Sequence, residues 1–203
     1  DNPQKLAEYE SLRQGVRPVG QIGMWGTSQG IAWDLFGERG ADPNDQRYEG
    51  NLDIRRILHT EFRFKRLAHR LDNDPVTNLD AAKANVFVRH DNQDTNVRYC
   101  PYYQDMEIRN RLVLPFLSQV TFNLDYRSQG RKGASQARAI SKCANCHIST
   151  AVRPMDQTTN ELRAGAEVRL GPAFIRYQYT DRSSKDDAAV ITNTYDRALH
   201  PLQ

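Results

Sequence analysis

Two cysteines and a histidine stand close together in the pentapeptide CANCH, residues 143–147. Cys143 and Cys146 are three positions apart, and His147 follows directly. This C-x-x-C-H spacing is typical of covalent attachment of a c-type haem. Positions i, i+3 and i+4 share one face of a helix, so the three side chains can approach one edge of a porphyrin together. The two thiols would form the thioether bonds, and His147 would be the proximal ligand of the iron.

The residues before the motif favour a short helix. Residues 135–142, SQARAISK, contain Ala and Arg and follow Gly130 and Gly133. Ser135 is a suitable N-cap for such a helix. We therefore expect the motif to lie on a short helix within a long polar, haem-binding connection over residues 128–161.

Other roles for the two cysteines remain open. A zinc site would need two further ligands, such as a second C-x-x-C pair, and the sequence contains no such pair. A thioredoxin-like dithiol would need a βαβ context, which the sequence does not indicate. A structural disulfide between Cys143 and Cys146 is the simplest alternative. The third cysteine, Cys100, is expected to be a buried, inert thiol, with an intermolecular bond as the alternative.

Over the five residues of CANCH, the chain resembles the c-type cytochromes. The resemblance implies one covalent haem c, electron transfer with other redox proteins such as cytochromes, and export to the periplasm or an equivalent compartment. It implies an electron carrier rather than an enzyme, unless the sixth iron position is open and binds a small ligand. The chain begins at Asp1 without a methionine, which we interpret as the result of signal-peptide removal.

Alternating apolar and polar residues predict antiparallel hairpins in much of the remaining chain. Residues 106–126 alternate on both sides of a three-residue loop. The register that we infer places Leu112 opposite Val120 and gives one apolar face. It also places Glu107 opposite Asp125, which is an unfavourable pair of like charges.

A second hairpin is predicted to turn at Gly171. It places Val168 opposite Ile175 on one face and Glu167 opposite Arg176 on the other. Further segments are assigned by their pattern alone: strands at residues 31–35, 52–68 and 86–88, a helix at 3–14, and loops at 72–78 and 183–187. Within residues 52–68, Ile54, Ile57, Leu58 and Phe62 also fit one face of a helix, which is the alternative for that segment.

The sequence thus predicts a mainly β protein, a single domain over residues 1–203 whose antiparallel hairpins form a barrel or a sandwich. The segments RLVLPFLSQVTFNLDYR and EVRLGPAFIRYQYTDR resemble outer-membrane β-barrels, specifically the porin partners of porin–cytochrome electron conduits. This resemblance implies an outer-membrane location. Barrels of that family are far longer, and a haem motif within a connection is not expected in them. A soluble β-rich domain is the alternative.

Charge and hydropathy indicate which classes of partner the sequence supports. The net charge of +3 comes from 28 basic and 25 acidic residues that are spread along the chain, so the sequence gives no indication of a nucleic-acid partner. No run of 18 consecutive apolar residues occurs, so no transmembrane helix is predicted.

Strand direction orders the candidates for the sixth iron ligand. The connection that holds the motif should lie at the end of the hairpins opposite their turns, together with the residues before 106 and after 179. His90 and His200 are therefore better candidates than His59, and Met155 is a local one, eight residues after the motif. We expect an exported mono-haem electron carrier. The alternative is an outer-membrane barrel or scaffold protein in which CANCH is structural.

Overall fold

The computed structural model describes residues 18–69, 71, 88–90, 99–140 and 148–192. Within these ranges the protein forms one nine-stranded sheet with a single 3-10 helix, η1 (Pro115–Leu117). The strands are β1 (Gly20–Ser28), β2 (Ile31–Arg39), β3 (Gln46–Ile54), β4 (Leu58–Ala68), β5 (Val88–His90), β6 (Tyr102–Val113), β7 (Val120–Ile140), β8 (Ile148–Leu170) and β9 (Ala173–Asp186). The prediction of a mainly β protein built from antiparallel hairpins is confirmed.

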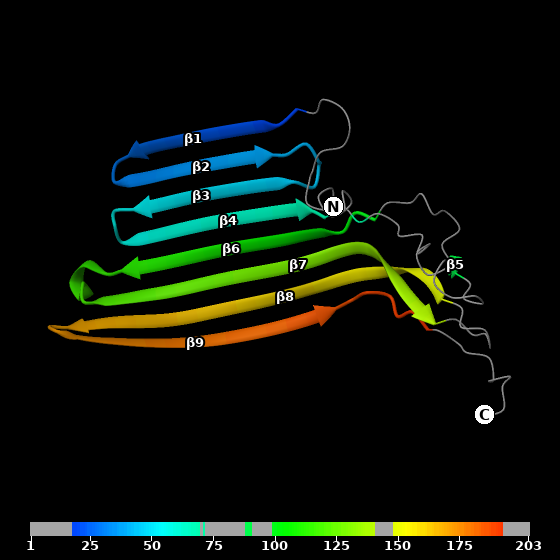
Figure 1. The fold of residues 1–203 in the computed structure, drawn as a ribbon. Helices are drawn as coiled ribbons and strands as arrows, with labels where there is room; N and C mark the ends of the chain where they lie inside the picture. Colours follow the sequence, from blue (N-terminus) through cyan, green and yellow to red (C-terminus); the bar gives the residue numbers. More distant parts are fainter. Residues whose placement is uncertain (1–17, 70, 72–87, 91–98, 141–147, 193–203) are drawn as a thin grey trace.

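The sheet is a single layer; the β1–β2, β3–β4, β6–β7 and β8–β9 turns lie at one end, and the β2–β3 turn lies at the other (Figure 1). Strands β1, β2, β3, β4, β6, β7 and β8 follow one another as antiparallel neighbours. β9 pairs with residues 157–170 of β8, and β5 runs parallel to residues 148–150 of the same strand. β1 and β9 form the two edges, so the described sheet is open. No helix in the described ranges is long and apolar enough to cross a membrane.

The helix expected before the haem motif is not formed over its described part. Residues 135–140 continue β7, paired with β8 as far as Ile140 opposite Ile148. The helix prediction rested on residue preferences worth at most about 0.7 kcal/mol each, and pairing with β8 outweighs them. The expected connection over 128–161 is therefore mostly strand. Only residues 141–147 separate β7 from β8, and these, with the whole CANCH motif, lie outside the described residues.

The first predicted hairpin forms with a register that differs from the prediction by two residues. Leu112 pairs with Phe122 rather than with Val120, because the loop is longer and contains η1. A shift of two keeps every side chain on its predicted face. It also removes the like-charge pair, since Glu107 now lies opposite Arg127.

The second predicted hairpin is confirmed residue by residue. Val168 pairs with Ile175, and Glu167 pairs with Arg176. On the polar face, Arg176 Nε lies 2.7 Å from Glu167 Oε1. The turn at Gly171 has a φ of +60°, a left-handed conformation that glycine adopts without strain.

Residues 52–68 belong to two strands rather than one. β3 ends at Ile54 and β4 begins at Leu58, with Arg56 in the turn at a φ of +59°. The backbone amide of Arg56 donates to Asp53 Oδ1 over 2.9 Å, an Asx-type turn contact. The alternating pattern continues through this turn without a break, because Ile54 and Leu58 pair with each other and share a face. The sequence therefore did not reveal the turn.

The remaining predictions have mixed outcomes. The strand at residues 31–35 is confirmed as part of β2, and the short strand at 86–88 overlaps β5. The loop predicted at residues 183–187 is wrong, because β9 continues to Asp186. Two predicted segments lie outside the described residues, at 3–14 and 72–78.

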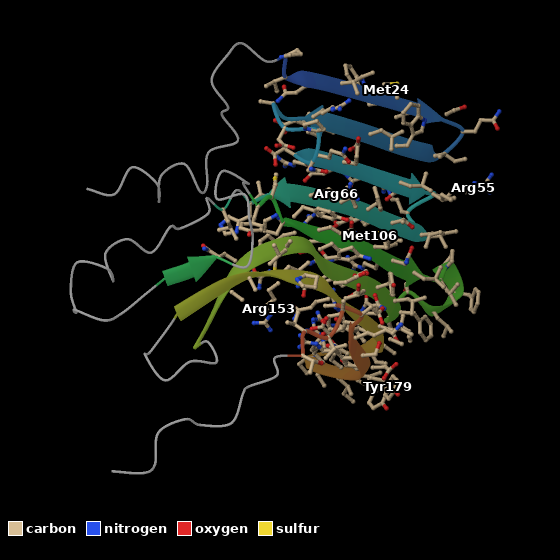
Figure 2. All side chains as sticks on the ribbon, turned by 90° about the vertical axis from the view of Figure 1, so that its right-hand side faces the viewer. Met24, Arg55, Arg66, Met106, Arg153 and Tyr179 are labelled. Carbon is tan, nitrogen blue, oxygen red and sulfur yellow. The ribbon has the colours of Figure 1, made fainter. Side chains whose placement is uncertain are left out.

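One face of the sheet is apolar over the part of each strand nearest the end that holds the turns at Pro115 and Gly171. We call this surface the apolar band. Side chains alternate between the faces of a strand, so the strand registers define its members. They are Ile22, Met24 and Gly26 of β1; Ile31, Trp33, Leu35 and Gly37 of β2; Tyr48, Gly50, Leu52 and Ile54 of β3; Leu58, Thr60, Phe62 and Phe64 of β4; Met106, Ile108, Asn110 and Leu112 of β6; Val120, Phe122, Leu124 and Tyr126 of β7; Leu162, Ala164, Ala166, Val168 and Leu170 of β8; and Ala173, Ile175, Tyr177 and Tyr179 of β9. Met24 and Tyr179 lie at opposite edges of the sheet (Figure 2).

The opposite face carries rows of charged side chains that pair with one another. Ion pairs join neighbouring positions of one strand, as in Arg109–Glu107 at 2.8 Å, and cross between strands, as in Arg127–Asp105 at 2.6 Å. Further pairs on this face are Arg47–Glu49, Arg63–Glu61 and Arg163–Glu161. The sheet is therefore strongly two-faced, with one apolar and one charged surface.

Candidate functional site

The motif CANCH is fixed to the end of the longest hairpin by chain connectivity. His147 directly precedes Ile148, the first residue of β8, and Ile148 pairs with Ile140, the last residue of β7. This end of the sheet lies opposite the turns at Pro115 and Gly171, as the strand directions predicted (Figure 1). The long connections of the chain leave the sheet at the same end.

His90 is the candidate distal ligand that the fold brings toward the motif. β5 lies parallel to β8 with His90 opposite Thr150. Neighbouring strands are about 4.8 Å apart, and the three residues from His147 to Thr150 span at most about 11 Å. The backbone of His90 thus lies one strand spacing from that of Thr150, near the start of β8, the strand that follows the motif in the sequence.

Met155 and His59 are less well placed. Met155 lies opposite Gly133, seven residues along β8 from Ile148, or about 23 Å along the strand. His59 stands near the turn end of β4, where its Nε2 lies 3.3 Å from Glu61 Oε1. His200, the remaining predicted candidate, lies outside the described residues.

A basic hollow lies beside Met155 on the charged face of the β7–β8 extension. It measures about 590 Å³, and Arg131, Arg153 and Gln157 line it together with the segment after β9. The guanidinium of Arg131 lies 5.2 Å from the centre of the Tyr103 ring, and its Nε has no hydrogen-bond partner among the described residues. Arg131 and Arg153 thus give this end of the sheet a positive surface.

The acidic side chain that lines the hollow, Asp186, is already hydrogen-bonded within the protein. Asp186 accepts hydrogen bonds from Gln157 Nε2 and from the backbone amide of Ala188, each over 3.0 Å. These two hydrogen bonds, with a weaker contribution from Arg153, hold the pKa of Asp186 below its usual value. Its carboxylate therefore stays ionised, but its single negative charge does not cancel the two positive charges of Arg131 and Arg153.

A small packed cluster joins the segment before β6 to the β7–β8 extension. Tyr99 and Pro101 are buried, and Pro101 lies so close to Gly133 that a Cβ there would come within 2.7 Å of the Pro101 Cα. Gly133 also has a φ of +126°, so a glycine is required on both grounds. Cys100, expected to be fully buried, is only partly so.

Sequence reasoning missed this cluster, because it depends on residues far apart in the chain; the only local signal was the pair of glycines before the motif, which we interpreted as the start of a helix. Strand direction does place Arg131 at this end of the sheet, but it does not reveal the hollow that Arg131 lines with Arg153. In the part of the chain that the structure describes, no three His, Cys, Asp or Glu side chains gather into a metal-binding group.

Comparison with known proteins returns no match: no family model, no curated protein and no solved structure is similar to this chain.

Proposed function

We propose that this protein is an exported mono-haem c-type electron carrier associated with the outer membrane. Cys143 and Cys146 form the thioether bonds, His147 is the proximal iron ligand and His90 is the distal one. The observation that carries the proposal is the pairing of β5 with β8, which sets His90 opposite Thr150, three residues after His147.

When bound, the haem supplies a one-electron iron couple, and two histidine ligands hold its potential below that of His–Met ligation. The chain's own residues have three tasks. The β7–β8 hairpin carries the motif away from the rest of the sheet, β5 brings the second histidine toward it, and Arg131 and Arg153 give the hollow on this hairpin a positive charge. A positive surface favours an acidic redox partner.

The first test is whether haem is covalently bound. We expect the protein, expressed in a host that matures c-type cytochromes, to keep haem staining on a denaturing gel. The Cys143→Ser and Cys146→Ser double variant should lose the stain, because no thioether bond remains. An unstained band for the unaltered protein, expressed at the same level, would reject the proposal.

A second candidate function is supported by the two-faced sheet, which does not itself require haem. In that case the protein is an outer-membrane or scaffold protein in which Cys143 and Cys146 form a structural disulfide. Mass analysis after alkylation without reduction separates the two functions. Two unmodified cysteines with no added haem mass indicate the disulfide, whereas the mass of one haem indicates the carrier.

A further inference from the structure

We propose that the apolar band contacts the hydrocarbon interior of a lipid bilayer, with the charged face turned away from lipid. This inference deepens the outer-membrane part of the proposed function and does not depend on haem. The band defines which face, which residues and which height of the sheet meet the acyl chains.

The band is large, continuous and exposed. It extends over every strand from β1 to β9 except the short β5, and its members include many large hydrophobic side chains left open to solvent by the sheet alone. Examples are Ile22, Met24, Leu35, Leu124, Ile175 and Tyr179. Exposed apolar patches of this extent are rare on soluble monomers and indicate a contact with lipid or protein.

Two polar side chains in the middle of the band, Thr60 and Asn110, are hydrogen-bonded within it. Thr60 Oγ1 donates to Asn110 Oδ1 over 2.9 Å, and Asn110 Nδ2 donates to the backbone oxygen of Leu124 over 3.1 Å. Charged side chains are absent from the band as defined. An unsatisfied polar group in hydrocarbon costs several kcal/mol, so this pairing suits immersion in lipid.

Glycines allow large side chains to lie flat within the band. A Cβ on Gly26 would lie 2.9 Å from the Trp33 ring, and one on Gly50 would lie 2.9 Å from Leu35 Cδ2. Tyr48 stacks on Phe64 with ring centroids 5.8 Å apart. The band is thus a closely filled surface rather than a set of separate protruding side chains.

The height of the band fits a membrane. It covers seven residues of β4, Leu58 to Phe64, and nine of β8, Leu162 to Leu170. At 3.3 Å per residue these lengths are about 23 and 30 Å, close to the ~25 Å apolar band of transmembrane strands.

The upper border of the band is level from β1 to β6 and is inclined to the strands only from β6 to β9. It lies at Met106 on β6, but Met106 pairs with Ser128, two residues beyond the border residue Tyr126 of β7. Likewise Leu162 of β8 pairs with Asp181, two residues beyond Tyr179 of β9. The four-residue drop is about 13 Å over three strand spacings of about 4.8 Å. This gives an inclination of roughly 40° across β6 to β9, where the border reaches the tilt range of membrane strands, whereas the border is level across β1 to β6.

A lipid-facing band has two structural consequences. The free edges of β1 and β9 must be paired in the membrane, with each other or with further strands, because hydrocarbon cannot satisfy their backbone groups. Fourteen residues of β7 separate Tyr126 from Ile140, or about 46 Å along the strand. The end of this hairpin at Ile140 thus lies well outside the hydrocarbon, where a water-soluble partner can reach it.

The two tryptophans of the chain provide a matched test. Trp33 belongs to the band, whereas Trp25 lies on the charged face opposite Asp34, at nearly the same height. In the sheet alone Trp25 is 80 % exposed and Trp33 only 39 %, so simple exposure predicts stronger quenching of Trp25. Contact of the band with lipid predicts the reverse.

The experiment compares Trp25→Phe and Trp33→Phe variants of the protein, reconstituted into phosphatidylcholine vesicles with and without bromine on the acyl chains. We expect bromine to remove most of the emission from Trp33, the tryptophan kept in Trp25→Phe, and little of that from Trp25. Acrylamide in the water should quench the two in the opposite order. Each intensity is compared with the unbrominated sample, so any quenching by haem cancels.

Equal quenching of the two residues, or stronger quenching of Trp25, overturns the proposal. A protein that remains in solution without detergent as a defined oligomer, with Trp33 shielded from both quenchers, also overturns it and assigns the band to a contact between copies. Neither result depends on haem staining, so the haem proposal and the lipid proposal fail independently.

Discussion

Thr60 of β4 and Asn110 of β6 lie directly opposite each other and are joined by a 2.9 Å hydrogen bond in the middle of the apolar band. Because Asn110 also donates to the Leu124 carbonyl oxygen, this polar contact links three adjacent strands. Two polar side chains that are hydrogen-bonded to each other inside an apolar surface can tolerate a medium without water, whereas either side chain alone would leave an unpaired polar group there.

Thr60→Val should therefore destabilise the protein in lipid by about 1 kcal/mol, because Asn110 Oδ1 loses its donor. The Thr60→Val and Asn110→Leu double variant should regain part of that loss, since both polar groups are removed together. The coupling is measured by urea unfolding of the single and double variants in vesicles. Strictly additive effects would show that the hydrogen bond is not maintained in the membrane.

Leu124 and Asn123 are neighbours on β7 with opposite surroundings. Leu124→Arg should cost about 2–4 kcal/mol in vesicles, because it places a charge in the apolar band. Asn123→Arg is the matched control: Asn123 lies on the charged face, in a hollow of about 200 Å³ that Asp125, Glu167, Arg163 and Arg176 also line, so a further charged side chain remains among polar groups. We expect the control to unfold within about 0.5 kcal/mol of the unaltered protein. Similar losses in the two variants would contradict the assignment of the faces.

His90→Ala should retain haem staining and change the coordination of the iron. Without the second imidazole the ferric spectrum should shift from low spin to high spin, and the reduced protein should bind carbon monoxide. His59→Ala and Met155→Leu are controls, because these residues lie near the turns and far along β8 respectively. An unchanged spectrum in His90→Ala would exclude it as the distal ligand, and a change in Met155→Leu would assign that role to Met155.

The local turn chemistry decided how well each hairpin could be predicted. The hairpin at Gly171 was predicted residue by residue, because a two-residue turn leaves one register and both faces agree with it. The earlier hairpin was displaced by two residues, because the extent of a loop containing η1 is not encoded in alternation. The apolar band survived this error, since an even shift does not exchange the faces.

Long-range pairing was beyond sequence reasoning. Ala and Arg before the motif favour helix locally, but residues 135–140 gain a strand partner in β8, which no local pattern reveals. The parallel contact between β5 and β8 joins residues about sixty positions apart. Strand direction did place His90 at the end of the sheet where β7 meets β8, because it determines which connections lie together.

Asp105 and Arg127 form a cross-strand ion pair just beyond the upper border of the band, with Nη2 and Oδ2 2.6 Å apart. The hydrogen bond from Arg127 holds the pKa of Asp105 below its usual value, against the opposing effect of burial. A lowered acid pKa stabilises the fold above the ordinary pKa of aspartate, and this stabilisation is lost as the pH falls through the lowered value. Arg127→Gln should remove it.

Both side chains are about 40 % exposed, so solvent screening limits the expected loss in Arg127→Gln to about 1 kcal/mol. The free energy of unfolding in urea, measured from neutral pH down to about pH 2, should show that loss near neutrality and convergence of the two proteins in acid. In an Asp105→Asn background, Arg127→Gln should show no pH-dependent effect, since the titrating group is gone. A difference that persists in acid, or that remains pH-dependent without Asp105, would assign the effect of Arg127 to its packing rather than to this ion pair.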